Sequence, residues 1–64
     1  MKLNIPDMNC GHCKASVEQA LSTLDSKAKI AVDLPGRMVE VETSAPQARV
    51  IAALREIGFE ARAV

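Results

Sequence analysis

The spacing of apolar residues along this 64-residue chain constrains its fold more than any other feature. Apolar residues two apart indicate a strand with one buried face, whereas apolar residues at i, i+3, i+4 and i+7 indicate an amphipathic helix. The chain changes between these spacings next to residues that favour turns, such as Pro6, Pro35 and Gly58. We therefore predict the element order β-α-β-β-α-β, with elements at 2–5, 11–23, 27–32, 38–43, 45–57 and 59–64.

This order predicts a single α+β domain over residues 1–64. Two βαβ units flanking a hairpin form a ferredoxin-like sandwich, in which a four-stranded antiparallel sheet carries both helices on one face. The outer face of the sheet is expected to be polar and solvated. The residues that we expect in the core are Leu3, Ile5, Val17, Leu21, Leu24, Ile30, Val32, Val39, Val41, Val50, Leu54 and Ile57.

The second predicted helix carries signals at both of its ends. Ser44 followed three residues later by Gln47 matches a capping box, and Pro46 suits the first turn of a helix. Gly58 suits the left-handed residue that ends a helix. Residues 33–37, which contain Pro35 and Gly36, are expected to form a tight turn between two strands.

Composition excludes several classes of protein. Eight basic residues balance eight acidic ones, so the chain lacks the excess positive charge of nucleic-acid-binding proteins. Phe59 is the one aromatic residue, which excludes a platform for stacking bases. No apolar run reaches the roughly 20 residues of a membrane span, and the first residues do not resemble a signal peptide. We therefore expect a cytoplasmic protein with reduced thiols and no membrane insertion.

The chemically reactive side chains gather in one tetrapeptide, Cys10-Gly11-His12-Cys13. It lies where the first strand leads into the first helix, and the positive end of a helix stabilises thiolates. We expect this position to lower the pKa of Cys13 in particular. Two intervening residues allow both sulfurs to converge on one point, and Gly11 is expected to permit the backbone bend that this requires.

Four interpretations of the cysteine pair compete. Idle cysteines are disfavoured by an exposed loop at a helix N-terminus. A thiol–disulfide redox site is suggested by C-x-x-C near a βαβ unit, but the chain is short for a thioredoxin-like fold. A closed zinc site within one chain needs four ligands, which Cys10, Cys13 and His12 do not supply. Two thiolates without hard ligands favour carriage of a soft ion, above all Cu(I), with mercury, silver and zinc as alternatives.

The segment Met8-Asn9-Cys10-Gly11-His12-Cys13 resembles the M-x-C-x-x-C signature of the heavy-metal-associated domain family. That family includes the CopZ-type bacterial copper chaperones and the N-terminal domains of copper-transporting P-type ATPases. The resemblance extends over the whole chain and includes the Gly58-Phe59 pair. It implies that Cys10 and Cys13 bind Cu(I), and that Met8 is buried beneath the loop without binding the metal.

The same resemblance implies a non-enzymatic copper chaperone. Such a protein hands Cu(I) to a P-type ATPase domain by thiol exchange, or to a copper-sensing repressor, and a copper-bridged homodimer is a further expectation. Where relatives commonly carry Gly and Thr, this chain has Asp7 and Asn9, and Asn9 keeps a hard carboxylate out of the position directly before Cys10.

The remaining residues near the motif have secondary expected roles. Phe59 stands where many relatives carry Tyr or Lys, and could shield the thiolates. His12 is expected to be exposed, with a modest electrostatic effect on the thiols, and could become a third ligand in a complex. Lys14 is the charge that we expect to contribute to partner docking. Arg37 is expected to be an ordinary solvated charge.

Overall fold

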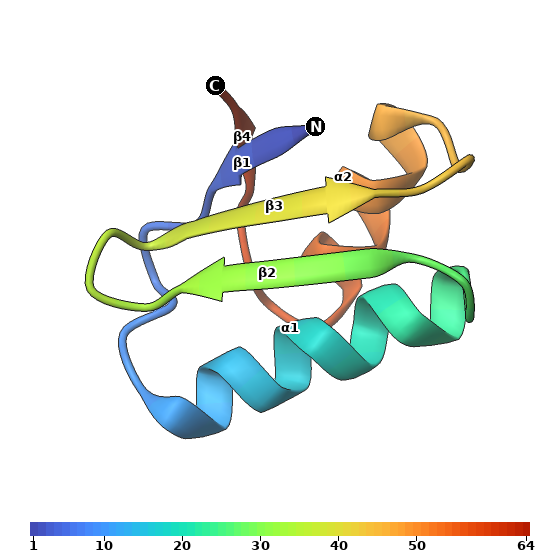
Figure 1. Ribbon diagram of the computed structural model, residues 1–64. Coiled ribbons are helices and arrows are strands. Elements are labelled where there is room, and N and C mark those ends of the chain that lie inside the picture. Colours follow the sequence, from blue (N-terminus) through green and yellow to red (C-terminus); the bar gives the residue numbers. More distant parts are fainter.

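The computed structural model describes all residues, 1–64, and has the predicted element order. Its four strands form one antiparallel sheet in the order β2-β3-β1-β4, and the two helices lie against one face of that sheet (Figure 1). The fold is the predicted ferredoxin-like one. The elements are β1 (Lys2–Asn4), α1 (Gly11–Leu24), β2 (Lys29–Asp33), β3 (Met38–Glu42), α2 (Gln47–Glu56) and β4 (Arg62–Ala63).

The central strand pair shows how the alternating pattern separates the two faces of the sheet. Leu3 pairs with Val39, and both side chains are fully buried beneath the helices. The neighbouring pair, Lys2 and Glu40, is exposed on the opposite face. The alternation of side chains along a strand therefore accounts for one packed and one solvated face.

The hydrophobic core differs from the predicted core at a few positions. Met8 and Ala61 are also buried, with exposed fractions of 0% and 7%. Ile57 is 43% exposed, so its assignment to the core is wrong. It follows the last residue of α2 and has left helical geometry, with φ −97° and ψ 11°, so it no longer continues the buried stripe of that helix. Three further predicted core residues, Leu24, Ile30 and Val32, pack against the core but remain partly exposed.

The capping box predicted at α2 is wrong. Pro46 is the N-cap and makes no side-chain cap bond, while Ser44 lies outside the helix. The hydroxyl of Thr43 instead accepts a hydrogen bond from the N–H of Ala45 at 3.1 Å, which closes a local turn before the helix.

The predicted role of Gly58 is confirmed. Its φ is +91°, and the N–H groups of Gly58 and Phe59 donate to the carbonyls of Arg55 and Leu54 at 3.0 and 2.9 Å. These are the two hydrogen bonds of a Schellman motif, which turns the chain out of α2 and toward β4.

Asp25 connects the end of α1 with the end of β3. Its carboxylate accepts a hydrogen bond from the Thr43 hydroxyl at 2.6 Å and another from the Lys27 N–H at 3.0 Å. The Thr43 bond, followed by the Lys27 bond, lowers the pKa of Asp25.

This hydrogen bond predicts a pH dependence of stability. Because the folded-state pKa of Asp25 is below the unfolded value of about 3.9, its contribution is complete above that pH and is lost as the pH falls through the folded-state pKa. We expect Thr43→Val to lower the urea concentration at the midpoint of unfolding at pH 7. We also expect this midpoint to fall less in the variant than in wild type as the pH is lowered. Urea unfolding from pH 7 to pH 2 tests this, with exposed Asp7→Asn as the control. Parallel curves for wild type and Thr43→Val would contradict the assignment.

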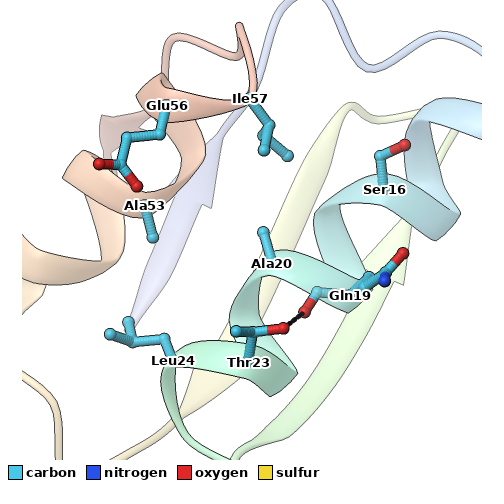
Figure 2. A pocket seen from close by; sticks show the side chains of 8 residues that line it. All are labelled: Ser16, Gln19, Ala20, Thr23, Leu24, Ala53, Glu56 and Ile57. Atoms are coloured by element: carbon cyan, nitrogen blue, oxygen red, sulfur yellow. Dashed lines mark hydrogen bonds between the residues drawn. The ribbon is translucent and has the colours of Figure 1, made fainter.

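The largest cavity is an open groove of about 680 Å³ between α1 and α2 (Figure 2). No cysteine lines it, so it is separate from the candidate metal site. The residues that line the groove are Ser16, Gln19, Ala20, Thr23, Leu24, Ala53, Glu56 and Ile57.

No helix has the length and apolar character required to cross a membrane.

Candidate metal centre

The cysteine loop connects β1 to α1, at the same end of the molecule as the turn between β2 and β3 (Figure 1). Cys10 is the N-cap of α1 and has extended geometry, with φ −146° and ψ 161°. Its sulfur accepts a hydrogen bond from the N–H of Cys13 at 3.3 Å, as a serine or aspartate oxygen does at other helix starts. The helix start therefore holds both cysteines in one turn.

The two sulfur atoms converge as the spacing predicts. The Sγ atoms of Cys10 and Cys13 lie 2.6 Å apart, within hydrogen-bond contact, and both cysteines are free. Cys10 is exposed, whereas Cys13 is half-buried and packs against the core. The pair thus consists of one partly buried inner sulfur and one solvent-facing sulfur.

The structure reverses the predicted order of thiol acidity. Contact with the Cys13 thiol, the hydrogen bond from the N–H of Cys13 and a smaller contribution from the N–H of His12 lower the pKa of Cys10. The same thiol contact, and then burial, raise the pKa of Cys13. The prediction for Cys13 is wrong because its contact with the Cys10 thiol and its partial burial outweigh the backbone N–H groups near its sulfur, while the N-cap sulfur of Cys10 accepts the N–H of Cys13.

This order predicts which thiol reacts first. Alkylation proceeds through the thiolate, so we expect Cys10 to be modified several-fold faster than Cys13 near neutral pH. Its rate should rise with pH and level off at a lower pH than the rate of Cys13. A short iodoacetamide pulse on the reduced, metal-free protein, followed by peptide mass spectrometry, measures both rates. Equal rates, or faster labelling of Cys13, would contradict the assignment.

Met8 lies where the family resemblance implies. Its side chain is fully buried in the core, and its N–H donates to the carbonyl of Ile5 at 3.0 Å. The thioether is therefore enclosed by apolar side chains, which suits packing and makes Met8 unsuited to capture an ion from solvent.

The other residues of the loop are exposed. Asn9, His12 and Lys14 all face solvent, and the N–H of Asn9 approaches the sulfur of Cys13. Gly11 is not needed for a special bend, because its φ is not positive and a Cβ there would meet no atom within 4 Å. That expectation is wrong, since Cys10 makes the turn with ordinary extended geometry.

Phe59 is half-buried and packs against the hydrophobic core. Its proposed shielding of the thiolates stays a prediction.

Arg37 was not expected at this end of the molecule, yet its guanidinium donates to the carbonyl of Pro6 at 3.1 Å. No sequence pattern indicates this contact, because it joins a side chain to the backbone carbonyl of a residue 31 positions away.

The donor set is two soft sulfurs in an open position. No group of three or more His, Cys, Asp or Glu side chains is placed to hold a metal ion together. Metal–sulfur bonds of about 2.3 Å would place sulfurs on opposite sides of an ion roughly 4.6 Å apart, so the thiols must separate to receive one. Cys10 is the exposed member of the pair, and the low coordination leaves the ion accessible to a third thiol.

Comparison with known proteins agrees with this arrangement. A copper chaperone CopZ from Staphylococcus aureus (strain bovine RF122 / ET3-1) is 42% identical over 40 residues, which cover 62% of this chain and 59% of the relative. A protein solved as a gold binding protein is 40% identical, with a TM-score of 0.95 over 97% of this chain and 95% of its own.

The copper chaperone Atx1 from Synechocystis PCC6803 shares the fold, with a TM-score of 0.94 and 24% identity over 97% of this chain and 98% of its own. The family model described as the heavy-metal-associated domain matches residues 2–60, which include the cysteine loop and all elements except β4. The chain therefore belongs to the heavy-metal-associated domain family.

Proposed function

We propose that this chain is a cytoplasmic copper chaperone that carries Cu(I) between Cys10 and Cys13. The observation that carries the proposal is the convergence of two free sulfurs at the start of α1, one exposed and one half-buried. Soft thiolates select soft ions, and the acceptor geometry at Cys10 favours its deprotonated form. Membership of the family and the CopZ relatives support copper as the cargo.

Transfer would proceed by ligand exchange. A thiolate of the acceptor attacks the bound ion, Cys10 or Cys13 leaves, and the second cysteine follows, so the ion is never released to water. The acceptor that we propose is the metal-binding domain of a copper-transporting P-type ATPase, with a copper-sensing repressor as a second recipient. Lys14, which follows Cys13 in the first turn of α1 and is exposed, is the charge that we propose for contact with such a partner.

Anaerobic competition against a chromophoric Cu(I) chelator tests the cargo. We expect one Cu(I) per chain, bound tightly enough for the protein to remove the ion from the chelator.

Size-exclusion chromatography with and without Cu(I) tests metal-bridged dimers, which should elute earlier than the metal-free protein. Incubation of the loaded protein with a purified ATPase metal-binding domain, followed by separation and metal analysis, tests transfer. Failure to compete with the chelator would overturn the proposal.

A second candidate cargo is another soft ion. The gold binding protein is 40% identical over nearly its whole length, and two thiolates also accept silver and mercury. Parallel titrations with Ag(I), Hg(II) and Zn(II) rank these ions against Cu(I).

The alternative from another functional class is a thiol–disulfide redox protein, which would use Cys10 as the attacking thiol. An insulin-reduction assay distinguishes the two, because a carrier should leave insulin intact. Reduction of insulin at a rate comparable to thioredoxin would favour the redox function.

A further inference from the structure

We propose that Arg37, in the turn between β2 and β3, is the positioning residue of the metal-binding loop. The proposal rests on the function proposed above, because positioning has a purpose only if the loop carries metal. Three observations carry it: the hydrogen bonds made by Arg37, its backbone conformation, and the contact between its turn and the cysteine loop.

The hydrogen bonds of Arg37 converge on the segment that leads into the cysteine loop. Its guanidinium Nη1 donates to the carbonyl of Pro6 at 3.1 Å. Its own carbonyl accepts from the N–H of Ile5 at 2.8 Å and from Nδ2 of Asn4 at 3.2 Å. One residue therefore holds three consecutive positions, 4 to 6, just before Met8 and the cysteines.

The backbone of Arg37 is in an unfavourable conformation. Its φ is +56°, and it is the one residue other than glycine with a positive φ. Such a conformation is sparsely populated for a side chain like arginine and persists where surrounding contacts determine it. The neighbouring Gly36, which could adopt it freely, does not. The turn thus places its strained residue where the guanidinium reaches Pro6.

The turn also lies directly against the loop. A small cleft of about 260 Å³ is lined by Asn9 from the loop and by Leu34, Pro35 and Arg37 from the turn. Figure 1 shows the two segments side by side at one end of the molecule.

Met8 in the core and Cys10 at the helix start hold two points of the loop, and the guanidinium of Arg37 holds a third at Pro6. Without the guanidinium, this segment would lose its hydrogen bond at Pro6 and keep the backbone bond from Met8 to Ile5. We expect the sulfurs to sample more positions and the bound ion to leave faster.

The test compares Arg37→Asn and Arg37→Gly with wild type. Both substitutions tolerate a positive φ, so they remove the guanidinium without adding backbone strain. Hydrogen exchange of the metal-free protein should show the Met8 amide exchanging about tenfold faster, from loss of one charge-assisted hydrogen bond, while Leu21 and Leu54 are unchanged. Anaerobic chelator competition should show a Cu(I) dissociation constant raised several-fold. Arg37→Lys, which keeps a donor, should restore part of both effects.

Arg49→Ala is the matched control, because it removes one exposed positive charge from α2 and should leave both measurements unchanged. Exchange that increases equally at Met8, Leu21 and Leu54 would indicate general destabilisation and overturn the proposal, as would unchanged exchange at Met8. If the wild type fails to bind Cu(I), the proposed function fails, and the exchange experiment still reports whether Arg37 holds the loop.

Discussion

The variants Cys10→Ser and Cys13→Ser are each expected to lose tight Cu(I) binding while the fold stays intact. A hydroxyl is a hard, neutral donor at physiological pH and cannot replace a thiolate toward a soft ion. Loss of one of two ligands should therefore weaken binding by more than the roughly 10- to 100-fold typical of outer contacts. Chelator competition measures the binding, and circular dichroism with thermal unfolding measures the fold.

The two variants should differ slightly in stability, which provides an internal check. Cys10 is the N-cap of α1, where serine is a favourable residue, so Cys10→Ser should be at least as stable as wild type. Cys13 is half-buried, so Cys13→Ser exposes a hydroxyl to part of the core and should be the less stable variant. Ser22→Ala, an exposed change in the same helix, serves as the control. Stoichiometric tight binding by the double variant would disprove the assignment of the ligands.

The sequence pattern predicts the architecture because an element that is buried on one face has apolar residues at a regular spacing, which is visible in the sequence itself. Val17 and Leu21, one helical turn apart, are both buried, and Val39 and Val41 alternate with exposed Glu40 and Glu42. Gly58 was predicted for a similar reason, since a left-handed helix end favours one residue type. These features depend on neighbours in sequence.

The features that the sequence did not predict depend on contacts across the fold. Ile57 fits the apolar stripe of α2, but the Schellman motif ends the helix before its side chain can reach the core. Ser44 has the composition of an N-cap, but Thr43 makes the local turn and Pro46 begins the helix.

The same distinction applies to the candidate site. The motif predicts which cysteines meet, because two intervening residues bring both sulfurs into the first helical turn. The order of their acidity depends on the contact between the two thiols, on the partial burial of Cys13 and on the position of Cys10 at the helix start, where its sulfur accepts the N–H of Cys13. The contact of Arg37 with Pro6 occurs together with a positive φ at Arg37, which no residue pattern predicts.

Substitution of Met8 is expected to have a large effect on stability. Its side chain is completely buried between the sheet and the helices, so Met8→Ala should lower the free energy of unfolding by about 2–5 kcal/mol, the usual cost of a cavity of that size. A domain of this length has a total stability of only about 3–10 kcal/mol, so the variant should be partly unfolded at moderate temperature. Urea unfolding followed by circular dichroism measures the change.

Met8→Leu separates packing from metal binding. Leucine has a similar volume and no sulfur, so we expect it to lower the stability by less than about 1.5 kcal/mol and to keep wild-type Cu(I) affinity. If Met8 were a ligand, Met8→Leu would lose affinity while remaining folded. If Met8 instead supports the loop by packing, only Met8→Ala should disturb the site, because it opens a cavity in the core against which Cys13 packs. The pair of variants therefore assigns the role of the first residue of the motif without reference to any relative.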